Sequence, residues 1–240
     1  MRISTRQLSC LICAFVLLAS QAYAADEVKD QPTCLSLRGK LLLSDDFPGQ
    51  ALSAEWKHPK GTWTVADGVL KGVELADDKH AAVVRHELKA HDLVAQFSFK
   101  FDGGKQTAFS VNDVKGHVCR VQITPTGFGL MRDKPSKTSD EKAAVLDRVS
   151  TPIKSGEWHT MVVEIRSKEM VASVDGAQVA FGANAGIDVD KTNFGFPVSG
   201  DSISIAHVRV WEALPNPAWD ATREKLEALR QKPAEALPKP

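Results

Sequence analysis

The chain has no formal net charge, because 30 lysine and arginine residues balance 30 aspartate and glutamate residues. Without an excess of basic residues it has no general electrostatic attraction for nucleic acid or for an anionic membrane. It also lacks an apolar run long enough to span a bilayer, since the run LICAFVLLA near its start is much too short. These absences favour a neutral partner, and an oligosaccharide or polysaccharide fits that description.

The first 24 residues have the pattern of a secretory signal peptide. Arg2 and Arg6 form a basic start, the apolar run follows, and Ala22-Tyr23-Ala24 provides a small-x-small cleavage site. Cleavage after Ala24 removes two arginines and no acid, which leaves 28 basic and 30 acidic residues. The sequence therefore predicts a secreted or periplasmic protein without a membrane span in its mature chain.

Cysteine is scarce, and the predicted cleavage leaves only Cys34 and Cys119. In an oxidising compartment two cysteines favour one disulfide, which would close a loop of about 85 residues and contribute roughly 4–5 kcal/mol. The alternative is two thiols that are buried separately. Two cysteines that are far from any histidine pair also argue against a zinc site, and the sequence indicates no cofactor.

Alternating strands and helices are absent, and many short strands separated by turn residues take their place. Segments such as TWTVADGVLKG and LVAQFSFKFDGG alternate apolar and polar residues and end at glycine-rich turns. Asp175-Gly176 joins two such segments and suits a tight hairpin turn. This pattern predicts an all-β fold of two antiparallel sheets.

Two regions depart from the strand pattern. Residues 133–150 form a charged insertion, for which we expect a loop with a short helical turn. Residues 216–231 are helical in pattern, with Asn216 as the N-cap, and Trp219, Leu226 and Leu229 are expected to dock the helix on the sandwich. The predicted division is a signal peptide (1–24), a leader (25–39), the β-domain (40–213), a C-terminal helix (214–231) and a disordered tail (232–240).

Three stretches resemble a known family. They are DDFPGQALSAEWKHPKGTWTVADGVLKG (45–72), GEWHTMVVEIRSKEMVASVDG (156–176) and SISIAHVRVWEA. They resemble the bacterial 3-keto-disaccharide hydrolase domain of the concanavalin A-like, laminin-G-like superfamily. The resemblance implies a jelly-roll sandwich of two antiparallel sheets, in which the concave face of one sheet holds the ligand.

The chemistry implied by this resemblance differs from ordinary glycoside hydrolysis. Ordinary hydrolysis needs two carboxylates beside the scissile bond, and the sequence has no strand of the Glu-x-Asp-x-x-Glu type that supplies them in concanavalin A-like glucanases. A 3-keto sugar instead permits β-elimination, which needs one base and one group that stabilises an enolate. The family carries a Glu followed by a Gln two residues later. Gln122 matches that Gln, but Arg120 replaces the Glu, so no catalytic residue is assigned.

The candidate glycan-binding residues are polar side chains on strands expected to be neighbours. They are Arg85, Arg120 and Gln122, with Asn112 and His80 nearby. Guanidinium and amide groups are planar, directional donors suited to sugar hydroxyls. The same residues also fit solvent-facing positions of antiparallel strands. His80 and His117 fit structural histidines better than catalytic bases, and strand alternation places His117 on the face of Cys119, opposite Arg120.

Asp45 and Asp46 end the first predicted strand, which is expected to pair with the last. Such an edge suits a structural calcium ion with oxygen ligands. Three functions therefore remain open. The first is an exported, hydrolase-like domain, active or degenerate, that acts on keto-glycosides. The second is a non-catalytic glycan-binding module. The third is an envelope protein-interaction domain with a protein partner.

Overall fold

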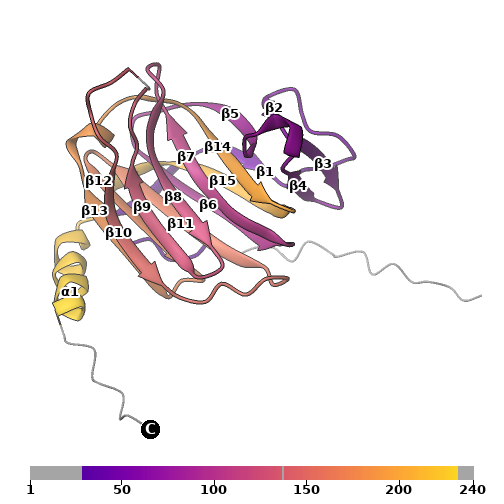
Figure 1. The fold of residues 1–240 in the computed structure, drawn as a ribbon. Coiled ribbons are helices and arrows are strands. Elements are labelled where there is room, and N and C mark those ends of the chain that lie inside the picture. The colour runs from indigo at the N-terminus through magenta and orange to yellow at the C-terminus, as the bar shows by residue number, and fades with distance from the viewer. Residues whose placement is uncertain (1–28, 137, 232–240) are drawn as a thin grey trace, which may run out of the picture.

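The computed structural model describes residues 29–136 and 138–231, and the predicted signal peptide and C-terminal tail lie outside them. The chain forms two antiparallel sheets and one C-terminal helix, which confirms the predicted fold class (Figure 1). Two short 3₁₀ helices, η1 (Ala76–Asp78) and η2 (Ala185–Ile187), lie in connections between strands.

The first sheet has eight strands in the order β13-β12-β11-β6-β15-β4-β3, with β1 also paired to β15. The expected pairing of the first strand with the last is therefore confirmed. The turn between β12 and β13 is the predicted hairpin, and Asp175 and Gly176 have positive φ angles of 51° and 68°. The strands are β1 (Ser36–Asp45), β3 (Thr62–Ala66), β4 (Val69–Val73), β6 (Leu93–Phe101), β11 (His159–Arg166), β12 (Glu169–Val174), β13 (Gln178–Ala183) and β15 (Ile203–Pro215).

The second sheet has seven strands in the order β10-β9-β8-β7-β14-β5-β2. Its strands are β2 (Trp56–Lys60), β5 (Ala82–Ala90), β7 (Gly104–Asn112), β8 (His117–Thr124), β9 (Gly127–Arg132), β10 (Ala144–Ser150) and β14 (Lys191–Gly200). Strand β10 occupies the end of the segment predicted to be a loop, so that prediction is wrong there. A register shift between Val145 and Asp147 lets both Leu146 and Val149 pack against the core, which hides the usual alternation.

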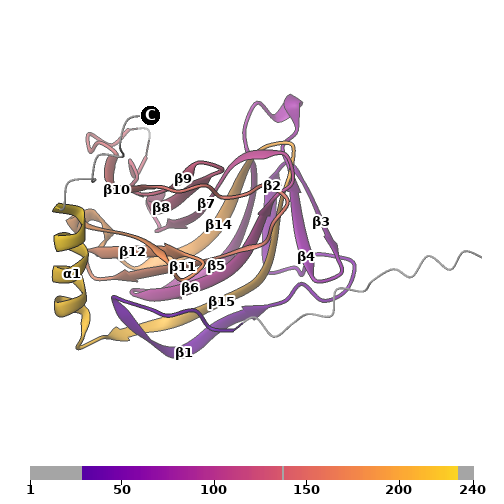
Figure 2. The same ribbon diagram turned by 90° about the horizontal axis from the view of Figure 1, so that it is seen from below.

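The core lies between the two sheets, which Figure 2 shows stacked one above the other. Phenylalanine rings from both sheets meet there: Phe97 of β6 lies 5.7 Å from Phe109 of β7 and 5.0 Å from Phe196 of β14, between ring centroids. These side chains are fully buried. The packed rings hold β7 and β14 in the middle of the seven-stranded sheet, whose opposite face is free to carry polar side chains.

The helix α1 (Trp219–Gln231) packs on the outer face of the eight-stranded sheet near one edge (Figure 1). Asn216 accepts a hydrogen bond from the backbone N–H of Ala218 at 3.0 Å, as its predicted capping role requires. Trp219 is buried and Leu226 packs beside it, but Leu229 is 62% exposed, so its predicted docking contact is wrong. Within the described residues, no helix is both long and apolar enough to cross a membrane.

The predicted disulfide is wrong, because Cys34 and Cys119 are both free thiols. Cys119 is fully buried in the core between the sheets. Cys34 packs with Leu35 and Trp219 on the outer face of the eight-stranded sheet. A whole sheet thus separates the two sulfurs. Burial raises the pKa of both thiols, that of Cys119 to about 12, so neither is an activated thiolate.

Candidate functional site

The outer face of the seven-stranded sheet carries a row of four residues on adjacent strands. Strand pairing places Arg85 opposite Gly195, Gly195 opposite Ser110, and Ser110 opposite Arg120. Two long cationic side chains thus flank two positions with little or no side chain. A Cβ atom added to Gly195 would lie 2.8 Å from Cγ of Arg85, so the stem of Arg85 lies across this glycine.

This row forms the floor of a pocket of about 330 Å³, here called the central pocket. It contains four of the five predicted glycan-binding residues, namely Arg85, Asn112, Arg120 and His80. The fifth, Gln122, lies beside it and donates a hydrogen bond of 2.7 Å to Gln106, which lines the pocket. The remaining lining residues are Ala81, Val83, Ser110, His117, Gly195, Pro197 and Ser199.

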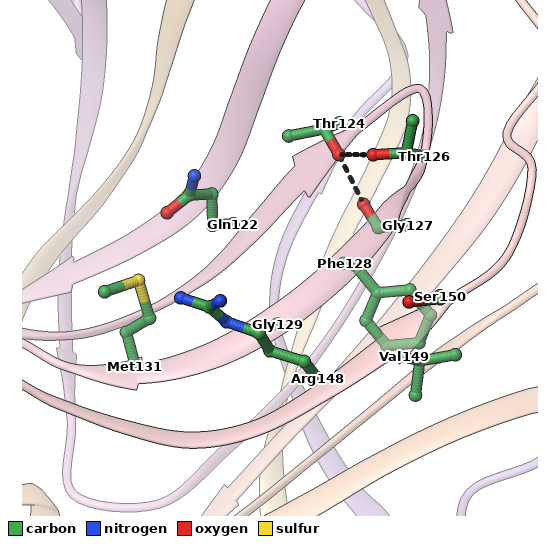
Figure 3. A pocket seen from close by; sticks show the side chains of 10 residues that line it. All are labelled: Gln122, Thr124, Thr126, Gly127, Phe128, Gly129, Met131, Arg148, Val149 and Ser150. Atoms are coloured by element: carbon green, nitrogen blue, oxygen red, sulfur yellow. Dashed lines mark hydrogen bonds between the residues drawn. The ribbon is translucent and has the colours of Figure 1, made fainter.

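A second pocket of about 280 Å³, the β9 pocket, lies on the other side of Gln122 (Figure 3). Arg148 and Met131 extend into it. At its far end the hydroxyl of Thr124 donates to the carbonyl oxygen of Gly127 and is also hydrogen-bonded to the hydroxyl of Thr126 (Figure 3). Gly129 repeats the role of Gly195, because a Cβ atom there would lie 3.2 Å from Cγ of Arg148. The lining residues are Gln122, Thr124, Thr126, Gly127, Phe128, Gly129, Met131, Arg148, Val149 and Ser150.

A third pocket, the loop pocket, adjoins the central pocket and shares three of its residues, Arg85, Asn112 and His117. Its other side is the turn Asp113–Gly116 between β7 and β8, where Val114 is 86% exposed. We call the three pockets together the groove. It extends across β5, β14, β7, β8, β9 and β10, which gives it an elongated form.

His117 faces the groove and not the core, contrary to the prediction from strand alternation. A β-bulge is the reason: Val111 of β7 pairs with Cys119, but the next residue, Asn112, pairs with His117. Two steps along β8 therefore oppose one step along β7, which changes the face on which the side chain lies. His80 also faces the groove, because it precedes the start of β5 at Ala82 and is outside the alternation.

A chain of hydrogen bonds fixes the state of His117. Asn112 donates from Nδ2 to Oδ1 of Asn193 at 2.7 Å, so its own Oδ1 is the acceptor that faces Nδ1 of His117 at 2.8 Å. Nδ1 therefore carries the proton, and Nε2 presents a lone pair. Burial is the main cause that lowers the pKa of His117. Asp133 opposes this effect, and the cations Arg120 and Arg85 lower the pKa further. The lowered pKa favours the neutral imidazole.

Arg120 pairs with Asp133, which the sequence analysis did not identify. Nε of Arg120 donates to both carboxylate oxygens of Asp133, at 2.8 and 2.9 Å, and its NH2 nitrogen lies 2.7 Å from Oδ1. The Asp133 side chain is only 4% exposed. Asp133 directly follows β9, and the charged segment in which it lies hid this position. The sequence signal that could have identified Asp133 is its position one residue after Arg132. Arg132 pairs with Cys119 of β8, so Asp133 lies close to Arg120 on the neighbouring strand.

Carboxylates are scarce in the groove. Of the residues that the structure describes, no aspartate or glutamate lines the central pocket or the β9 pocket, and Asp113 alone lines the loop pocket. The carboxylate of Asp133 is already occupied by Arg120. Among the described residues, the lining of the groove therefore lacks the two carboxylates that ordinary glycoside hydrolysis requires.

Protein hydrogen-bond donors surround the carboxylates of Asp45 and Asp46, where the sequence suggested a structural calcium ion. Asp45 accepts hydrogen bonds from the backbone N–H of Phe47 and from Nε1 of Trp56, each at 2.7 Å. Burial acts to raise the pKa of Asp46, but its contacts with His207 and Arg209 together outweigh this effect and lower the pKa. Within residues 29–136 and 138–231, no group of three or more metal-ligating side chains comes together.

Comparisons with known proteins identify the fold of the chain. The sequence matches no family model and no curated protein. The carbohydrate-binding module CBM66 from Bacillus subtilis is 14% identical, with a TM-score of 0.55 over 66% of this chain and 96% of that chain. The laminarinase from Rhodothermus marinus is 13% identical, with a TM-score of 0.57 over 73% of this chain and 98% of that one.

Porphyranase B from Zobellia galactanivorans gives a similar result, with 13% identity and a TM-score of 0.57 over 73% of this chain and 93% of that chain. The compared structures thus include enzymes and a binding module, and at these identities the similarity concerns architecture. It agrees with the two-sheet topology of the chain, whose fold is a concanavalin A-like antiparallel β-sandwich with one C-terminal helix.

Proposed function

We propose that the chain is an exported, non-catalytic glycan-binding domain whose ligand lies in the groove. The observation that carries this proposal is the central pocket, where Arg85, Asn112, Arg120 and His80 converge from separate segments without a carboxylate pair. Export is inferred from the signal-peptide pattern of residues 1–24. The fold similarity to a carbohydrate-binding module supports the proposal at the level of architecture.

The groove has the chemistry that saccharide recognition needs. Sugars present many hydroxyls, and the guanidinium of Arg85, the amide of Gln106 and the hydroxyl of Ser110 offer donors or acceptors along one surface. The central and β9 pockets lie on both sides of the Gln122–Gln106 hydrogen bond, so consecutive sugar units have adjacent places to bind. We expect an oligosaccharide to bind across the strands.

Filling the floor of the central pocket should remove binding. Ser110 lies between Gly195 and Arg120 in the row, so the ring of a Ser110→Phe variant would occupy the space between the two arginines. We expect at least tenfold weaker retardation of the variant in affinity gels that contain the polysaccharide bound by the native protein. The matched control is Thr64→Phe, an exposed strand position on the other sheet, which should bind normally.

Thermal unfolding of both variants shows whether they are folded. Equal retardation of a folded Ser110→Phe variant and the native chain would mean that glycans do not occupy the central pocket. A native chain that is retarded by no polysaccharide in a broad panel would contradict the proposal as a whole.

A second function is supported by the state of His117. A neutral imidazole with a free Nε2 lone pair is a suitable base, and Arg85 and Arg120 are suitable groups to stabilise an enolate. Acting on a 3-keto-glycoside, Nε2 of His117 would take the proton from C2. The electron pair of the C–H bond would form the C1–C2 double bond as the C1–O bond breaks. The leaving oxygen then takes a proton from water.

This second function predicts release of p-nitrophenol from a p-nitrophenyl 3-keto-glucoside. The rate should rise with pH through a value below the ordinary pKa of histidine, because the base is active when neutral. His117→Gln should slow release at least tenfold, whereas His80→Gln, also in the pocket, should stay within about twofold. Absence of release by the native protein would exclude this activity and leave the binding proposal intact.

A further inference from the structure

We infer that the groove binds an acidic saccharide and that Arg85 holds its anionic group. This inference rests on the proposed glycan-binding function and specifies the class of glycan. It differs from the expectation of a neutral partner, which the overall charge of the chain suggested. The charge of the groove, and not that of the chain, is the quantity that matters for a ligand bound there.

Basic side chains dominate the groove around the central and loop pockets. Arg85, Arg120, His80 and His117 line the central pocket, and Lys115 lines the loop pocket. Arg85 belongs to both pockets and thus lies at their junction. These residues come from two stretches of the chain, 80–85 and 115–120, so the fold brings the charges of Arg85, Arg120 and Lys115 together.

The negative charges near the groove are mostly committed elsewhere. Asp133 is buried against Arg120. Asp113 uses Oδ1 to accept hydrogen bonds from the backbone N–H groups of Lys115 and Gly116, within its own turn. Glu87 lies two residues along β5 from Arg85 and is exposed, but it lines none of the three pockets. The charge of the central pocket therefore remains positive.

Of the two arginines in the central pocket, Arg85 is the one available to a ligand. Its guanidinium has no hydrogen bond or ion pair with any residue in the described part of the chain, whereas that of Arg120 is held by Asp133. Its stem is fixed across Gly195, which directs the guanidinium over the floor of the pocket. A guanidinium in this position matches the two oxygens of a carboxylate or sulfate group.

The physical argument for an acid is a comparison of two bound states. A neutral sugar over the pocket would displace water from Arg85 and offer only hydroxyl oxygens in return. An acidic sugar would offer a charged acceptor, and charge-assisted hydrogen bonds are about twice as strong as neutral ones. The pocket should therefore prefer a saccharide that carries a uronate carboxylate or a sulfate ester over its neutral counterpart.

The experiment compares acidic polymers with their neutral counterparts by isothermal titration calorimetry on the full chain. The carboxylate arm uses oligogalacturonides and their methyl esters, and the sulfate arm uses oligo-carrageenans and their desulfated forms. We expect at least tenfold tighter binding of the acid in one arm, and the arm identifies the anionic group. We also expect this preference to weaken as salt rises from 0.05 to 0.5 M.

Variants locate the effect. Arg85→Gln should remove the preference for the acid, and Arg85→Lys should keep part of it, because lysine retains the charge but not the planar fork. Lys71→Gln removes the same charge from an exposed position on β4 of the other sheet and should change nothing. Equal loss in Lys71→Gln and Arg85→Gln would overturn the assignment to Arg85.

The outcomes separate this inference from the proposed function. Binding of neutral glycans with no preference for acids would overturn the inference while the glycan-binding proposal stands. Binding of none of the acidic or neutral saccharides would overturn the inference, and the polysaccharide panel described above would then decide the wider proposal.

Discussion

Replacing Arg120 by alanine is expected to lower the free energy of unfolding by about 3 kcal/mol. The cause is the partner that remains, because the carboxylate of Asp133 is 4% exposed and would lose its bidentate contact. A buried charge without its partner is far more costly than an exposed one. Chemical denaturation of the native and variant chains measures the change.

A double-mutant cycle with Asp133→Asn tests the stated cause. The amide introduced by Asp133→Asn is neutral, so removal of Arg120 would leave no unpaired buried charge in this background. Arg120→Ala should therefore lower the free energy of unfolding clearly less in the Asp133→Asn background than in the native one. Arg148→Ala is the matched control, since Arg148 also extends over the outer face of the sheet but lies in the β9 pocket, and its loss should cost less than about 1 kcal/mol. Additive effects of the Arg120 and Asp133 changes would contradict the coupling.

This result bears on how ligand binding is best examined. Weak binding by an Arg120 variant could arise either from lost ligand contacts or from a change in the position of Asp133. Arg85 has no such partner in the described structure, so its replacement reports on the ligand more directly. Of the two arginines that flank the central pocket, one mainly maintains the site and the other is free to act in it.

The second large effect concerns Glu164 and pH. Glu164 is 2% exposed on β11 and accepts hydrogen bonds from the backbone N–H groups of Cys34 at 2.8 Å and Ser36 at 2.7 Å. Burial raises its pKa to about 7, against the opposing effect of these hydrogen bonds and of Arg38. In the unfolded chain the pKa returns to the ordinary value of glutamate.

The sign follows from which state holds the proton. Between about pH 4.5 and 7 the folded state keeps a proton on Glu164 that the unfolded state releases, so this residue makes stability fall as pH rises. The stabilisation is complete below the unfolded pKa and is lost as pH passes the folded value, a change of about 3 kcal/mol. Glu164→Gln has no such proton, and its stability should lack this component.

The measurement is the difference in unfolding free energy between native and Glu164→Gln chains at several pH values. At pH 5 the variant should be less stable, because its amide accepts only one of the two backbone hydrogen bonds. The difference should shrink or reverse by pH 8. Glu157→Gln, at an exposed position, should follow the native curve throughout. A constant difference for Glu164→Gln across this range would show that its proton is not linked to folding.

The sequence predicted the architecture well because alternation and turn chemistry are local signals. The Asp175-Gly176 hairpin and the capping of the helix by Asn216 both follow from such signals. The prediction of a disulfide between Cys34 and Cys119 was wrong, because a correct prediction required knowing on which side of a sheet each sulfur lies. The cellular compartment and the number of cysteines carry no such information.

For the candidate site, the sequence predicted which face of its strand most residues occupy, but not how these residues are arranged relative to one another. Alternation placed Arg85 and Arg120 on outward faces, yet only the strand order shows that Gly195 and Ser110 lie between them. A bulge of one residue reversed the face of His117. Asp133 was hidden because its partner is in a strand that pairs with the end of β9. Each omission came from non-local pairing.

The start of the described chain lies against the sheet that does not carry the groove. The backbone N–H of Gln31 donates to Gln96 on that sheet, and Trp219 packs beside Leu35 there, while Figure 2 shows β1 on the side away from β7, β8 and β9. Immobilisation on a sensor surface through a tag next to residue 29 would therefore leave the groove open to solution. Coupling through a side chain introduced on β8 should obstruct it, which gives two orientations of one protein for separating ligand capture from non-specific adsorption.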